Sequence, residues 1–87
     1  MIEKYQQEFE KAQEMAKKDP IHGAGPLAVA SNNLAVVLLK EGRIREARKY
    51  NDGALVLLQG LEKAEVGGID ALRDSIRLTK RRLDQLN

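Results

Sequence analysis

The stretch from Leu27 to Gly42, LAVASNNLAVVLLKEG, carries no charge before Lys40. Its apolar side chains fall on nearly every face of a helix, and only Ser31, Asn32 and Asn33 interrupt them. A helix that is apolar almost all round is buried among its neighbours. The sequence therefore predicts a central helix that other helices cover on both sides.

Composition favours an all-α fold. The 87 residues include two Tyr, one Phe and no Trp, so the core must be built from Leu, Val, Ile and Ala. A strand sandwich uses more β-branched and aromatic residues than this, whereas closely packed helices do not need them. A chain of this length has room for one small domain with one core. We expect a single domain of four helices.

Apolar periodicity places the first two helices. Ile2, Tyr5 and Phe9 begin a stripe with steps of three and four that predicts a helix over residues 2–18. Because proline disfavours helical geometry in the residue before it, Asp19-Pro20 should end this helix. We expect a glycine-containing loop over residues 21–25, followed by the central helix over residues 26–41.

The third and fourth helices follow the turn at Gly42, which is placed to cap the central helix and begin an antiparallel hairpin. The third helix runs from Arg43 to about Glu65, and Gly53 and Gly60 within it are expected to permit close helix approach. Asn51 interrupts its apolar seam, either buried, where it fixes register or oligomeric state, or facing water with Tyr50 over the gap. The fourth helix spans residues 69–86, and its narrow seam consists of Ile69, Leu72, Ile76, Leu83 and Leu86, with Thr79 as a polar gap.

The hairpin resembles a known repeat. From Asn32 to Leu55 it follows the pattern N-N-L-A-x-x-L-x-x-x-G-R-x-x-E-A-x6-A-L. This is similar to the tetratricopeptide repeat (TPR), a helix–turn–helix unit, and most similar to the repeats of kinesin light chains and their bacterial relatives. The resemblance implies a four-helix α-α superhelix-like domain. In it, residues 1–19 form a half-repeat helix, residues 26–66 a TPR-type hairpin and residues 69–87 a capping helix.

The same resemblance implies a protein–protein interaction module or adaptor that binds a peptide or helix along its first helices. In the family, an Asn before the Leu-small pair often hydrogen-bonds the ligand backbone, and here that position is Asn33; the alternative is that Asn33 satisfies a nearby carbonyl. The implied groove residues are Val29, Asn32, Asn33, Val36, Leu39 and Lys40. With Lys40 as its one cation, this groove favours an apolar or helical ligand over a carboxylate clamp.

Two alternative functions, each from a different class than the interaction module, are also consistent with the sequence. The first is a structural, self-assembling protein, a homo-oligomer in which the N-terminal half-repeat and the seam of the fourth helix pair with another copy. The second is a nucleic-acid accessory protein that uses one of two basic clusters. These clusters are Arg43, Arg45, Arg48 and Lys49, and Lys80, Arg81 and Arg82. Acidic residues interleave with both and no aromatic residue accompanies them for base stacking, so solvated faces are favoured and we do not expect nucleic acid as a partner.

The sequence offers few candidate catalytic or metal-binding residues. The chain has no Cys, and its one His, His22, has no positioned Ser, Cys or carboxylate pair, so we expect no enzyme activity, no cofactor and no metal. The sequence near Met1 has no apolar leader. The longest apolar run is short and interrupted by Asn, so we expect no membrane span and a cytoplasmic location.

Overall fold

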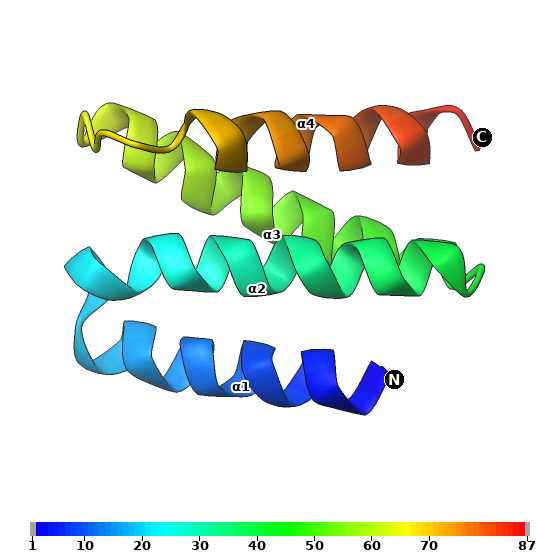
Figure 1. Ribbon diagram of the computed structural model, residues 1–87, viewed down its shortest axis with the longest axis horizontal. Helices are drawn as coiled ribbons and strands as arrows, with labels where there is room; N and C mark the ends of the chain where they lie inside the picture. Colours follow the sequence, from blue (N-terminus) through cyan, green and yellow to red (C-terminus); the bar gives the residue numbers. More distant parts are fainter. Residues whose placement is uncertain (1, 87) are drawn as a thin grey trace.

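The structure, a computed structural model, describes residues 2–86, which form four α-helices and no strand. The helices are α1 (Ile2–Lys18), α2 (Pro20–Lys40), α3 (Ile44–Lys63) and α4 (Asp70–Asp84). Successive helices run in opposite directions (Figure 1). The all-α fold and the helix hairpin that the sequence predicted are confirmed.

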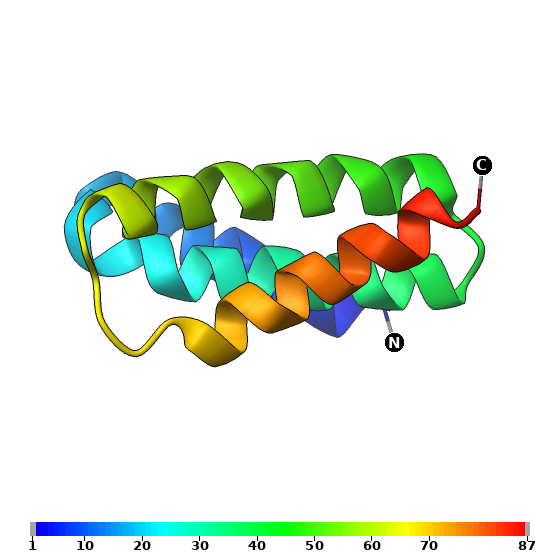
Figure 2. The same cartoon turned by 90° about the horizontal axis from the view of Figure 1, so that it is seen from above.

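Helix α2 occupies the centre of the fold and contacts each of the other three helices. Figure 2 shows α3 running alongside α2 and α4 crossing α2 diagonally, and α4 contacts both α2 and α3. Ala28, Leu34 and Ala35 of α2 are completely buried. The apolar stretch that opens the sequence is therefore the central element, as its composition predicted.

The prediction of a loop over residues 21–25 is wrong, because α2 already begins at Pro20. Asp19 caps this helix: its carboxylate accepts a hydrogen bond from the backbone N–H of His22 at 3.3 Å. Pro20 occupies the first turn, where a missing N–H costs nothing, and Pro26 lies inside the helix. The hairpin therefore extends from Pro20 to Lys63, and its start lies earlier than the predicted position 26.

The turn of the hairpin forms at Gly42, as predicted. Gly42 has a φ of +77°, a left-handed conformation that favours glycine. The backbone N–H of Arg43 donates to the carbonyl of Leu38 at 2.9 Å, and that of Gly42 donates to Leu39 at 3.0 Å. These bonds satisfy the last carbonyls of α2 and turn the chain directly into α3.

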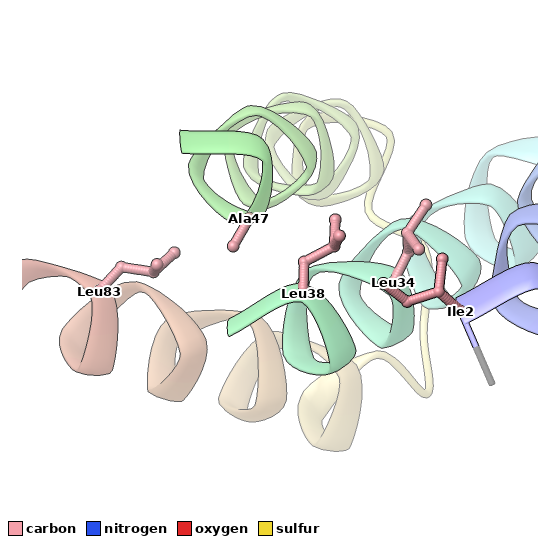
Figure 3. Packing of buried hydrophobic residues seen from close by; sticks show 5 residues of the cluster. All are labelled: Ile2, Leu34, Leu38, Ala47 and Leu83. Atoms are coloured by element: carbon pink, nitrogen blue, oxygen red, sulfur yellow. The ribbon is translucent and has the colours of Figure 1, made fainter. Parts of the chain in front are cut away.

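The outer helices complete the core of the hairpin. One cluster joins Ile2 of α1 and Leu83 of α4 to Leu34, Leu38 and Ala47 (Figure 3). A second cluster consists of Ala28, Ala54, Leu58 and Ile76. The apolar seam predicted for the fourth helix is therefore confirmed at Ile76 and Leu83. Because α4 ends at Asp84 and Leu86 is 54% exposed, Leu86 is not part of this seam.

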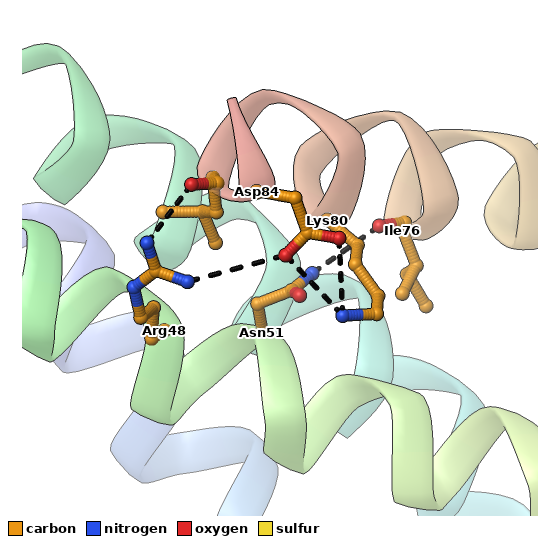
Figure 4. Close-up of polar contacts among 6 residues, drawn as sticks. Arg48, Asn51, Ile76, Lys80 and Asp84 are labelled. Carbon is orange, nitrogen blue, oxygen red and sulfur yellow. Dashed lines mark hydrogen bonds and ion pairs between the residues drawn. The ribbon is translucent and has the colours of Figure 1, made fainter. Parts of the chain in front are cut away.

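Polar side chains hold α4 in place. Asn51 is buried, and its amide nitrogen donates to the carbonyl of Ile76 at 3.2 Å (Figure 4). The guanidinium of Arg48 donates to the carbonyl of Leu83 at 2.9 Å, at the C-terminal end of α4. Of the two alternatives for Asn51, the buried one is correct, and its contact sets the register of α4 against α3.

By length and composition alone, α2 is long and apolar enough to cross a membrane, with 21 residues and a mean hydropathy of 1.2. The helix begins six residues before the predicted position 26, so it is longer than the apolar run within it. A helix packed at the centre of a helical domain has the same composition. The position of α2 among three helices is a sufficient reason for its apolar character.

Candidate functional site

Four of the six predicted groove residues form one stripe along α2. Val29, Asn33, Val36 and Lys40 follow one another at helical steps of four, three and four. Val29 is 45% exposed, Asn33 and Lys40 are exposed, and Val36 is half-buried. The structure therefore brings these four side chains together on an accessible face of the central helix.

The other two predicted residues lie off this stripe. Asn32 is buried, and its amide oxygen accepts a hydrogen bond from the hydroxyl of Thr79 at 2.9 Å. Leu39 is half-buried and packs against the core cluster around Leu38. Asn32 thus joins α2 to α4, and Leu39 supports the core.

A hollow of about 340 Å³ lies between the stripe and α4. We call it the α2–α4 hollow; its lining consists of Val29, Asn32, Asn33, Gly68, Ala71, Leu72 and Ser75. Gly68, Ala71 and Ser75 have small side chains, so they leave room opposite α2. No charged residue lines the hollow.

Sequence reasoning missed the α4 side of this hollow. The fourth helix was interpreted only through its buried seam, whereas Ala71 and Ser75 lie beside that seam. Their signal is weak: small residues, four positions apart, on a helix that otherwise carries many charges. They face α2 only because Asn51, Thr79 and Arg48 fix the orientation of α4.

Asn33 is a polar residue of the hollow whose side chain is free to hydrogen-bond a ligand. No hydrogen bond joins its side chain to any other residue in the span 2–86. An amide offers two N–H donors and one carbonyl acceptor. The side chain can therefore donate to and accept from a peptide backbone that enters the hollow.

Two members of the basic cluster at the start of α3 form contacts within the chain. Arg43 donates to both carboxylate oxygens of Glu46, at 2.8 and 2.7 Å, and this contact lowers the pKa of Glu46 and raises that of Arg43. Arg48 is bonded to α4. Arg45 and Lys49 are exposed, and the ammonium of Lys49 lies over the ring of Tyr50, 5.8 Å from its centroid, so the cluster is not one continuous free surface.

The seams proposed for self-assembly are also used within the chain. Ile2 and Ala12 of α1 are buried, as are Ile76 and Leu83 of α4. Contact between copies would need another surface.

The next feature is the placement of the potential metal ligands and of the one histidine. Residues 2–86 contain no group of three or more His, Asp or Glu placed to hold a metal ion. The ring of His22 lies on the surface with its Nδ1 2.8 Å from the carboxylate of Asp19. This hydrogen bond, together with the one from the His22 backbone, lowers the pKa of Asp19.

No family model, curated protein or solved structure matches this chain. The likeness of its hairpin to the TPR pattern therefore remains an expectation from the residues between Asn32 and Leu55. What bears on function is the geometry of the α2–α4 hollow.

Proposed function

We propose that this protein is a protein–protein interaction module that binds a short peptide segment or helix in the α2–α4 hollow. The observation that carries the proposal is the side chain of Asn33, an exposed amide with no partner within residues 2–86, at the edge of an uncharged hollow. The TPR-like spacing of the hairpin supports it, because that resemblance assigns ligand binding to the same position.

The hollow suits an apolar side chain next to a hydrogen-bonded backbone. Val29 and Leu72 contribute apolar walls, and the volume of about 340 Å³ lies at the small end of ligand pockets. Burying one ligand side chain of the size of Leu is worth about 1.5–3 kcal/mol. Each net hydrogen bond to Asn33 adds about 1 kcal/mol. Together these terms amount to about 4–5 kcal/mol, so we expect a short motif bound weakly, with a Kd on the order of 0.1–1 mM.

Selection from a displayed library of random peptides tests this function. The wild-type chain should enrich peptides with an apolar anchor, and their Kd is then measured by fluorescence anisotropy. Asn33→Ala should weaken binding about fivefold, the equivalent of about 1 kcal/mol. Val29→Glu should abolish binding, because it places a charge beside an apolar wall.

Val56→Glu is the matched control, because Val56 is also an exposed valine, but it lies on α3, away from the hollow. Circular dichroism should show that all three variants keep their helicity. Failure to enrich any peptide, or equal losses in Val29→Glu and Val56→Glu, would contradict the proposal.

A further inference from the structure

A second apolar depression lies over the N-terminal half of α2, on the side that carries α3. Two adjoining hollows of about 290 and 320 Å³ form it, and both include Leu57. The first is lined by Phe9, Leu27, Tyr50 and Gly53, among others, and the second by Ile21, Val56, Gly60 and Val66. We call the two together the α3 face. Leu27 of this face and Val29 of the α2–α4 hollow are two residues apart on α2, about 200° around the helix, so the two hollows point in different directions.

The α3 face exposes large apolar side chains. Ile21 is 83% exposed, Val56 67% and Val66 43%. Single apolar residues are common on protein surfaces, but a contiguous group of them marks an interaction site.

The glycines of α3 have no packing reason within the chain. A Cβ atom at Gly53 would meet only Ser31 Oγ, at 3.8 Å, and one at Gly60 would meet nothing within 4 Å. The expectation that they permit close approach of helices within this chain is therefore wrong. Glycine inside a helix is unfavourable relative to alanine, and here both glycines lie in the lining of the α3 face, where an outside backbone can come close.

We propose that the occupant of the α3 face is a second copy of this chain, with the two α3 helices antiparallel about a two-fold axis between Val56 and Leu57. Gly53 and Gly60 are equally distant from this point, so each Gly53 lies opposite Gly60 of the other copy. A two-fold contact must be self-complementary in this way.

The charges at the rim agree with this register. Asp52 and Lys63 are exposed, and neither makes an ion pair anywhere in the described residues. In the antiparallel register Asp52 lies opposite Leu61 of the second copy, two residues from its Lys63, or about 3 Å along the helix axis. Opposite charges therefore meet twice, once on each side of the axis.

The two hollows of the α3 face are lined by residues of α1, α2 and α3, so a second copy would cover apolar side chains from three helices. The two-fold axis also places the hollow lined by Tyr50 in one copy against the hollow lined by Ile21 in the other copy.

Sedimentation equilibrium over a concentration series tests the proposal. The wild-type chain should show a monomer–dimer equilibrium. Val56→Glu should give a monomer, and Leu78→Glu, which changes an exposed apolar residue on α4, outside the α3 face, should leave the equilibrium unchanged. A wild-type chain that stays monomeric up to about 100 μM, or a Leu78→Glu variant that dissociates as fully as Val56→Glu, would overturn the proposal.

Two further sets of variants test the register. Asp52→Lys and Lys63→Asp should each weaken the dimer about tenfold, and the double variant should restore it. Gly60→Gln should weaken the dimer while raising the melting temperature of the dilute monomer, because Gln is the better helix former. A double variant no tighter than the single ones would refute the antiparallel register. Peptide binding in the α2–α4 hollow should persist in Val56→Glu, so the two proposals fail separately.

Discussion

At Gly23 the backbones of α1 and α2 approach so closely that a Cβ atom would lie 2.5 Å from Ala16 Cα. Two residues later, a Cβ atom at Gly25 would meet nothing within 4 Å. Both glycines are in the first turns of α2, in the segment that the sequence predicted as a loop. Glycine content alone cannot distinguish a flexible linker from a contact between helices, because the difference depends on which helix lies opposite.

We predict that Gly23→Ala lowers the free energy of unfolding by about 1–3 kcal/mol, because the added methyl group forces α1 and α2 apart. Gly25→Ala is the matched control and should raise stability by up to about 1 kcal/mol through helix propensity. Urea unfolding followed by circular dichroism measures both. Equal effects of the two substitutions would argue against the close contact at Gly23.

At the scale of elements, the sequence predicts helices well and their beginnings less well. The stripe of Ile2, Tyr5 and Phe9 and the glycine at position 42 gave α1 and the hairpin turn close to where they are. Asp19-Pro20 was interpreted as a helix end, yet an Asp cap followed by Pro is also a signal for a helix start. Here the pair does both, since only Asp19 separates α1 from α2.

The cap at Asp19 predicts a pH dependence. The folded state holds the pKa of Asp19 below its ordinary value of 3.8, through hydrogen bonds from the side chain and backbone of His22. The ionised carboxylate therefore stabilises the fold above about pH 4, and this contribution is lost as the pH falls through the lowered pKa. Asp19→Asn keeps a capping side chain but cannot titrate there.

The melting temperature of the wild type should exceed that of Asp19→Asn at pH 5, and the difference should shrink at pH 2. Measuring both proteins at each pH cancels the contribution of other carboxylates, such as Glu46. A difference that stays constant between pH 5 and pH 2 would show that the Asp19 cap does not titrate as described.

At the scale of the whole molecule, α2 separates two surfaces with different lining. The α2–α4 hollow is built on the stripe of Val29 and Asn33, and the α3 face on Val56 and its neighbours. The α2 half of the hollow could be predicted, because it depends on helical spacing alone. Its other half could not, since Ala71 and Ser75 reach it only through the orientation that Asn51 gives to α4.

The central claim is that a peptide binds between α2 and α4, and amide chemical-shift mapping with a library-selected peptide tests it most directly. The account predicts that titration with the peptide shifts the amide resonances of residues 29–36 and 68–75, and leaves residues 53–60 of α3 unchanged. Shifts concentrated in residues 53–60, or spread evenly over all four helices, would contradict it.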